Sequence, residues 1–585
     1  MSDPALYFDF AEKILRSAKL TEPYRFVASS GCIWPYQESP GMVERIHNSL
    51  QARFKNYKNN RRDKTTQPFY TIAAGPGAGK SRLLDELPSL FLKAAKQSEN
   101  KDLIERMEST YVFKISFENG ISFDASKANQ PPANAIASRM WYQLCREDLH
   151  INGIVQGSHH RMEGVLAKLA ELKAKERDSY CVMVLVDGMH HLHHKMAKSL
   201  LGHISNTALS GKEFFIVAVA GLVFRSFESF FSQSMGTFVN LMPPRLAKPE
   251  DVIPDVASLP QLSLLRSYMG GHPRALEILF NEVENVKASK FSTSISELES
   301  HVIAELRRRY FSEKVNDSIG DILAVVLGRR KFDHITAVVT PTLTVDNVQR
   351  FGLVQWLEDG DKTLDMPPIF IKILAKSLND PLLMSAFPEY ARADDDASDL
   401  WRFFEKFVAI YRAIKMRAFA GRECSLGELY DGARITTTAK DVRVQVPLGI
   451  FKVTVCTKQF DTKGSSVSHL PENATMRYST VYVNGRNAPY GDVFLDNQIV
   501  DGSNLREAIA CKLLTGTSIS DDKFQEERNK AASHEDMFVL VTPNVVNVDL
   551  NKYESDLVAI IDEDCYKDYF GSFTGVVYWH ATQGK

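Results

Sequence analysis

The stretch "AAGPGAGKSRLL", residues 73–84, decides the fold prediction. A short apolar run at 69–73 predicts a strand before it, and leucines at helical spacing predict a helix after it. Residues 74–81 form the turn between them and match a Walker A motif, with alanine in place of the first glycine. Glycines in such a turn let backbone N–H groups point at phosphate oxygens. We therefore expect a nucleotide site with ATP and Mg²⁺ as cofactors. The alternative is a glycine-rich turn that holds no ligand.

The side chains of this motif have distinct expected roles. Lys80 would reach the β- and γ-phosphate oxygens, and the Ser81 hydroxyl would hold Mg²⁺. The residues expected to contact the cofactor are Gly75, Gly77, Ala78, Gly79, Lys80, Ser81 and Arg82.

The run "CVMVLVD", residues 181–187, is continuously apolar up to its final aspartate, as a strand buried on both faces should be. We expect Asp187 to be the Walker B acid, a second Mg²⁺ ligand and, with Lys80, a catalytic residue. Many ATPases place another acid directly after this aspartate to polarise the attacking water, whereas this chain has Gly188. Whether hydrolysis is efficient is therefore left open.

Four histidines follow at once: His190, His191, His193 and His194. His190 and His194 have the i, i+4 spacing of one helix face, which would suit a metal ion or a histidine replacing the missing acid. No third ligand is evident, and the simpler interpretation is the polar start of a helix.

Two more apolar runs, at 111–117 and 214–222, predict strands of the same sheet. Helical periodicity at 134–145 and 161–175 alternates with them. Alternating strands and helices predict an α/β fold with a parallel P-loop NTPase sheet, and we place this domain at residues 65–250. Residues 1–64 form a helical, basic segment before it.

Composition narrows the class of protein. A chain of 585 residues exceeds the usual size of one hydrophobic core, so several domains are expected. The net charge of −2 means that a nucleic acid would have to bind a local basic patch. Seven scattered cysteines without a CxxC pair favour a reducing compartment, and no apolar run is long enough to cross a bilayer. We expect a soluble intracellular protein without a signal peptide.

The middle, residues 251–390, reads as a helical lid followed by a winged-helix-like unit. Pro273 opens a helix, and Arg274 just inside it could reach back to the nucleotide phosphates or face solvent. The strand, "DGDK" turn and helix around 353–378 could bind DNA or pack on the nucleotide domain as a lever. A polar, acidic stretch at 392–401 marks the next boundary.

Residues 395–585 carry a second set of polar residues. Asp492 starts one predicted strand and Lys512 lies on the next, the arrangement of a restriction-endonuclease-like (PD-(D/E)xK) metal site. Glu405, on a preceding apolar helix, would complete the Mg²⁺ ligands or be a partly exposed helical glutamate. The acid expected two residues before the lysine is replaced by Ala510, and Glu507 points to the other face of a regular strand.

Taken together, "GPGAGKSRLLDELP", "GGHPRALE", "APYGDVFL", "IACKLL" and "YFGSF" resemble the Crinkler family of oomycete and fungal effectors, which is related to the retrotransposon hot spot proteins of trypanosomes. The resemblance implies an ATPase joined to a nuclease-like domain, entry into host cells, nuclear localisation and action on DNA or chromatin. By this match Lys80, Ser81 and Asp187 belong to the ATPase, and Glu405, Asp492 and Lys512 to the nuclease. The family's ubiquitin-like header is not visible at residues 1–60.

Two hypotheses follow. The first is an ATP-dependent switch that controls a Mg²⁺-dependent nuclease acting on DNA in the nucleus. The second is a nucleotide-dependent effector whose nuclease fold is catalytically decayed and which binds DNA or a nuclear protein partner. The basic stretch at 53–64 would contact phosphates or form a solvated helix end. Gly188 and Ala510 favour the second hypothesis, since each removes a group that the chemistry would use.

Overall fold

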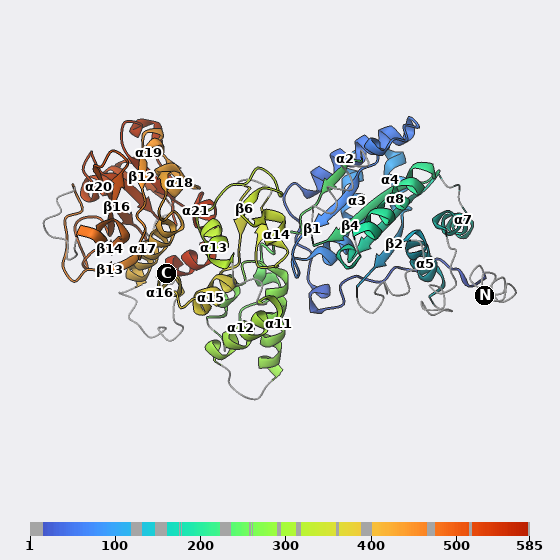
Figure 1. Cartoon of the computed structure of the whole chain (residues 1–585), viewed down its shortest axis with the longest axis horizontal. Helices are drawn as coiled ribbons and strands as arrows, with labels where there is room; N and C mark the ends of the chain where they lie inside the picture. The colour runs from blue at the N-terminus through green and yellow to red at the C-terminus, as the bar shows by residue number, and fades with distance from the viewer. Residues whose placement is uncertain are drawn as a thin grey trace. The chain divides into compact units, whose positions relative to one another are not determined.

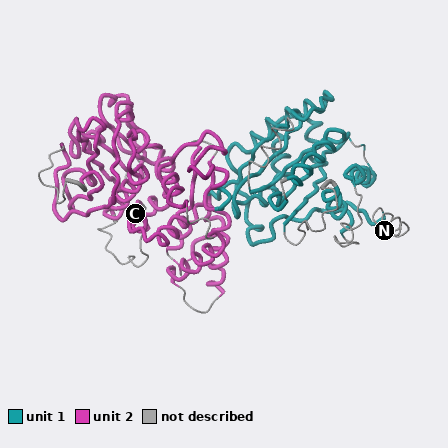
Figure 2. Tube along the Cα trace, viewed as in Figure 1, with its two compact units in different colours: residues 1–247, 349–352 teal, residues 248–348, 353–585 magenta. Residues whose placement is uncertain are grey.

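A computed structural model describes most of the chain in two compact units (Figures 1 and 2). Unit 1 comprises residues 1–247 and 349–352, and unit 2 comprises residues 248–348 and 353–585. The described residues are 16–118, 132–146, 161–174, 176, 178–192, 194–222, 236–256, 259, 261–288, 294–311, 318–357, 362–387, 400–464, 474–513 and 518–582. His193, most of the 392–401 boundary and part of the "DGDK" turn lie outside them. The domain boundaries expected from sequence stay predictions.

Unit 1 contains a parallel sheet that the described residues build from five strands in the order β2-β3-β4-β1-β5. The strands are β1 (Phe69–Ala73), β2 (Tyr111–Ser116), β3 (Cys181–Asp187), β4 (Phe214–Gly221) and β5 (Phe238–Asn240). β3 and β4 are buried along their whole length, which explains their continuous apolar sequence. The carboxyl ends of parallel strands share one edge of the sheet, so the turn after β1 and the end of β3 face the same side.

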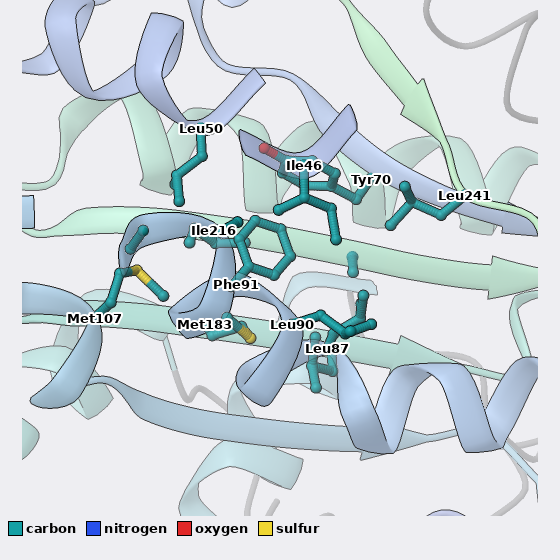
Figure 3. Close-up of a cluster of buried hydrophobic side chains, with 14 of the residues drawn as sticks. Ile46, Leu50, Tyr70, Leu87, Leu90, Phe91, Met107, Met183, Ile216 and Leu241 are labelled. Carbon is teal, nitrogen blue, oxygen red and sulfur yellow. The ribbon is translucent and has the colours of Figure 1, made fainter. Parts of the chain in front are cut away.

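Helices complete unit 1: α2 (Met42–Lys58), α3 (Lys80–Lys96), α4 (Lys101–Glu108), α5 (Pro132–Cys145), α7 (Met162–Lys173) and α8 (His194–Ser210). Side chains of α2, α3 and α4 form one hydrophobic core with the sheet, in which Leu50, Phe91, Met107 and Met183 converge (Figure 3). α5 packs on β2, α7 and α8. The basic stretch at 53–64 is partly used in this packing, because Arg53 is buried and Tyr57 donates a hydrogen bond to the Lys212 carbonyl.

The first part of unit 2 is mostly helical. Its elements are α10 (Leu262–Tyr268), α11 (Pro273–Ala288), α12 (Ile295–Tyr310), α13 (Ile319–Leu327), β6 (Val338–Thr340), β7 (Leu343–Thr344), α14 (Val345–Gln349), β8 (Gln355–Trp356), β9 (Leu364–Asp365), α15 (Pro368–Ser377) and α16 (Pro381–Ser385). β6 pairs with β7 and β8 with β9, both antiparallel. The short β8–β9 pair is followed by α15, the strand-then-helix order expected from sequence, and most of the expected turn between the two strands lies outside the described residues.

The second part of unit 2 is a mixed sheet, nine-stranded among the described residues, with a main order of β10-β12-β15-β16-β18-β20-β11. Its strands are β10 (Glu423–Ser425), β11 (Arg434–Ile435), β12 (Arg443–Gln445), β13 (Lys452–Val455), β14 (Thr480–Val483), β15 (Val493–Ile499), β16 (Asn504–Cys511), β18 (Met537–Val541) and β20 (Val558–Ile561). A separate pair joins β17 (Ser518–Ser520) and β19 (Val545–Asn547). The chain is therefore α/β, as predicted.

The helices of this part are α17 (Leu400–Ala418), α18 (Leu426–Leu429), α19 (Thr437–Asp441), α20 (Asp521–Ala531), α21 (Tyr566–Phe570) and α22 (Thr574–Thr582). α17 packs on β13, β14 and α22. Within the described part of the chain, no helix combines the length and the hydrophobicity needed to cross a lipid bilayer.

A buried ion pair ties α17 to the sheet. Arg412 donates to both carboxylate oxygens of Glu507 at 2.7 Å, and Tyr430 and Asn497 donate to the same carboxylate. Burial opposes the charge on Glu507, but these donors, Arg412 above all, hold the pKa of the carboxyl below its usual value. Glu507 is thus committed to structure on the face away from Ala510.

Removing one member of this pair should destabilise the fold. Glu507→Gln leaves the Arg412 guanidinium buried without its counter-charge, which is expected to lower the free energy of unfolding by about 3–5 kcal/mol. The control is Glu526→Gln on the exposed face of α20, where the change should stay within about 0.5 kcal/mol. Chemical unfolding followed by circular dichroism measures both, and equal stability of the two variants would contradict a structural role for the pair.

Candidate functional site

The turn after β1 has the backbone of a phosphate loop. Gly77 and Gly79 adopt φ angles of 71° and 94°, a left-handed conformation that other residues adopt only with strain. Gly79 is the N-cap of α3, so the helix begins at Lys80 directly after the turn. The backbone N–H groups at the start of α3 therefore face the carboxyl edge of the sheet, where an anion is favoured.

Lys80 lies inside this loop. Its side chain is buried, and Nζ donates to the Gly75 carbonyl at 2.9 Å. Burial lowers the pKa of the amine, while the carboxylates of Asp187 and Glu118 act in the opposite direction. A buried amine with one carbonyl partner beside a row of helix N–H groups is suited to the oxygens of a polyphosphate.

Ser81 and Asp187 meet at the carboxyl edge of the sheet. The Ser81 hydroxyl donates to Asp187 Oδ2 at 2.6 Å. Asp187 is buried, with 3% of its surface exposed. Burial raises the pKa of Asp187, as does the nearby Glu118, against the hydrogen bond from Ser81 and the charge of Lys80. A hydroxyl and a carboxylate in contact are hard oxygen donors of the kind that Mg²⁺ prefers, so the residues present fit this ion.

Two basic residues predicted at the phosphates have protein partners in the described structure. Arg82 donates to the carbonyls of Cys32 at 2.7 Å and Trp34 at 3.0 Å, which fastens the N-terminal segment to α3. Arg274 belongs to unit 2, where it pairs with Glu277 at 2.6 Å. Their roles toward a nucleotide stay predictions.

The histidine cluster differs from the helix face considered from sequence. His190 and His191 lie in a 3-10 turn, η4 (Met189–His191), and α8 starts only at His194, so His190 and His194 do not share one continuous helix. Gly188, with φ of 76°, starts this turn and breaks the expected periodicity. Burial, with the neighbouring His191, Lys80 and Arg350, lowers the pKa of His190 to about 4, so its ring is neutral near pH 7.

Glu118 is a residue that sequence reasoning missed. The Nε2 atoms of His190 and His191 lie 3.5 and 3.6 Å from its Oε1. The ligand atoms of these three residues all lie within 4.8 Å of one another. The available signal was a glutamate directly after a predicted strand of the same sheet, at 111–117.

A second cluster forms at one edge of the unit 2 sheet. Asp492 immediately precedes β15, and Lys512 immediately follows β16 instead of lying on the strand as predicted. The two strands are antiparallel with Val493 opposite Ile509, so the start of one meets the end of the other. Lys512 Nζ lies 3.3 Å from Asp492 Oδ2, which also accepts the Cys511 N–H at 2.7 Å.

Glu405 joins this cluster from α17. It is buried rather than partly exposed, and it shares a hydrogen bond with Asp492. Burial raises the pKa of Glu405 to about 9, and the adjacent Asp492 acts in the same direction. Two carboxyl groups in contact, one of them holding a proton at neutral pH, form a donor set that a divalent cation can occupy by displacing that proton.

Glu527 on α20 is the other residue missed from sequence. Its Oε2 lies 3.2 Å from Lys512 Nζ, so the lysine sits between two acids. Both acids raise the pKa of Lys512 against the effect of burial. Ala510, in the position of the expected acid, is buried in a hydrophobic cluster with Phe538 and Leu540. The structure therefore groups Glu405, Asp492 and Lys512 and adds an acid from a helix.

Comparison with known proteins gives one extensive match. Crinkler effector protein 108 of Phytophthora sojae is 29% identical over an alignment of 622 residues, which covers 97% of this chain and 72% of that protein. No protein-family model matches the chain.

Solved structures match only loosely. The ORC2 protein of Aeropyrum pernix is 12% identical with a TM-score of 0.32, covering 59% of this chain and 96% of that one. Cdc6p of Pyrobaculum aerophilum is 14% identical with a TM-score of 0.31, covering 60% and 97%. The strand order of the unit 1 sheet and the geometry of its phosphate loop define the fold of unit 1. The protein is similar to this Phytophthora sojae effector along almost its whole length, which supports the resemblance to the Crinkler family that its motifs predicted.

Proposed function

We propose that unit 1 binds ATP together with Mg²⁺ and acts as a nucleotide-dependent switch. The observation that supports this most directly is the meeting of Lys80, Ser81 and Asp187 at one edge of the sheet, with the Ser81–Asp187 contact at 2.6 Å. Lys80 would exchange its contact with the Gly75 carbonyl for the β- and γ-phosphate oxygens. Ser81 and Asp187 would hold Mg²⁺, which when bound neutralises charge on the phosphates.

Lys80→Ala should abolish this binding. Loss of a charge-assisted hydrogen bond to phosphate is expected to weaken ATP binding on the order of 100-fold or more. The matched control is Lys96→Ala at the far end of the same helix, where the side chain is exposed and ATP affinity should not change. Isothermal titration calorimetry with MgATP measures all three proteins. Parent-like affinity of Lys80→Ala would refute the assignment.

For unit 2 we propose a nuclease-like site that acts on DNA. Glu405 and Asp492 would hold Mg²⁺, which when bound polarises a phosphodiester and its attacking water. Lys512, placed between Asp492 and Glu527, would orient that water. Delivery to a host cell and action in the nucleus belong to this proposal and rest on the family relationship.

A basic cleft in unit 2 supports contact with DNA. It has a volume of about 830 Å³ and is lined by three acidic residues, Asp321, Glu428 and Asp431, and by six basic ones, Arg329, Arg330, Lys331, Arg417, Arg422 and Lys440. Arg417 also pairs with Asp380, and Lys331 with Asp431, so part of this charge is balanced within the unit. The remaining positive charge suits a phosphate backbone without selecting a base sequence.

The second candidate function is binding without cleavage. Ala510 favours it, because a buried methyl group replaces the metal-binding acid expected two residues before Lys512. In this case the same cluster would survive as a structural remnant while the chain recognises DNA or a nuclear protein partner in a nucleotide-dependent manner.

Plasmid cleavage with Mg²⁺ or Mn²⁺ distinguishes the two functions. If unit 2 is a nuclease, Lys512→Ala should reduce the rate by about 100-fold or more, because the water loses its positioning group. The control is Lys552→Ala, which changes an exposed lysine that pairs with Asp521 and should cleave like the parent. Each protein is assayed with and without ATP, and a rate that depends on ATP is expected for a switch. Background activity in parent and Lys512→Ala alike would leave only the binding function.

A further inference from the structure

Glu118 lies beside Asp187 at the carboxyl edge of the unit 1 sheet. β2 and β3 pair in parallel with Ser116 opposite Asp187, and the Phe117 N–H donates to the Asp187 carbonyl at 3.1 Å. Glu118 is therefore the first carboxylate beyond the end of β2, one strand over from the Walker B aspartate. Its own N–H donates to the Ser116 hydroxyl at 3.0 Å, which fixes the backbone at this point.

The position of Glu118 explains why residue 188 is a glycine. A Cβ atom at Gly188 would lie 2.7 Å from Glu118 Cγ and 3.2 Å from the Glu118 backbone nitrogen. Gly188 also has φ of 76°, where other side chains are strained. The space next to Asp187, where many ATPases place a second acid from the same strand, is thus occupied by an acid from the adjacent strand.

The charge of Glu118 acts on the same groups that would bind the nucleotide. Its charge adds to burial in raising the pKa of Asp187 and partly opposes the lowering of the Lys80 pKa by burial, so its carboxylate lies within electrostatic range of the phosphate loop and of the residues expected to hold Mg²⁺. The side chain is 28% exposed, which leaves room for a water molecule at its oxygens. The Nε2 atoms of His190 and His191, at 3.5 and 3.6 Å, restrict the position of Oε1.

We propose that Glu118 is the catalytic base of ATP hydrolysis in this chain and supplies the function that Gly188 lacks. The inference deepens the proposed nucleotide site and rests on it. Glu118 accepts a proton from water as the water oxygen bonds to the γ-phosphorus. The bond between that phosphorus and the β–γ bridging oxygen breaks, and its electron pair leaves with ADP. The proton then passes from Glu118 to solvent or to the released phosphate, which restores the carboxylate.

The geometry also fixes what His190 and His191 do in this step. Both rings place Nε2 within 3.6 Å of Glu118 Oε1, so we assign them the role of positioning residues for this carboxylate.

Glu118→Gln tests the proposal, since it keeps the shape of the side chain and removes its ability to accept a proton. The rate of phosphate release from ATP should fall by about 100- to 10,000-fold. The affinity for MgATP, measured by calorimetry, should stay within about threefold of the parent, because the base does not hold the nucleotide. Glu108→Gln at the exposed end of α4 is the matched control and should leave both quantities unchanged. Glu118→Asp, whose carboxylate is one methylene shorter, should hydrolyse ATP at an intermediate rate.

Several results would overturn the assignment. If Glu118→Gln hydrolyses ATP at the parental rate, or if the parent binds MgATP without hydrolysing it, Glu118 is not a catalytic base. The proposed nucleotide-binding site would still stand in either case. Loss of MgATP binding in Glu118→Gln would make this residue part of the binding machinery instead. Binding of ZnCl₂ to the nucleotide-free parent that Glu118→Gln and His190→Ala both abolish would assign the carboxylate to a metal site. A parent that binds no ATP would refute the proposed function itself.

Discussion

The hydrogen bond from the Ser81 hydroxyl to the Asp187 carboxylate joins the two parts of the sequence on which the account of unit 1 depends. These residues lie more than one hundred positions apart, yet parallel pairing brings the carboxyl ends of their strands to one edge of the sheet. The turn after β1 then needs glycines, because the chain must reverse into α3 while its N–H groups face outward. The position of Lys80 follows from the helix that starts there.

The buried carboxyl groups of the two candidate sites differ in the direction of their pKa shift from the carboxyl group of Glu507, which has a structural role. The Glu507 carboxylate accepts two hydrogen bonds from Arg412 and one each from Tyr430 and Asn497, and its pKa is lowered accordingly. At Asp187, Glu405 and Asp492 the balance is reversed, because burial and neighbouring acids raise the pKa of each carboxyl. Lys512 lies 3.3 Å from Asp492 and Arg402 lies 3.5 Å from Glu405, so nearby cationic side chains offset part of this cost, and a bound divalent cation would offset more of it.

Residues marked by a local sequence signal or a family motif could be predicted, and residues without such a mark could not. The phosphate loop is contiguous, so strand, glycines, Lys80 and helix are visible in one stretch. Asp187 could be found because an acid at the end of a buried strand is a local signal. Glu118 and Glu527 reach their sites from a neighbouring strand end and from α20, and only strand order and helix docking reveal them. His190 and His194 do not share the helix face considered from sequence, because Gly188 initiates a 3-10 turn. The spacing of residues along the sequence does not reveal that a glycine adopts a left-handed backbone conformation.

The most direct measurement is diffraction from crystals of the intact protein grown with a slowly hydrolysed ATP analogue and Mn²⁺, recorded at the manganese absorption edge. The account predicts an anomalous peak at coordination distance from Ser81 Oγ, on the side facing Asp187, with the triphosphate along residues 75–80 and Lys80 Nζ on its β- and γ-oxygens. Saturating nucleotide that leaves this loop without density, or manganese found away from Ser81 and Asp187, would contradict it.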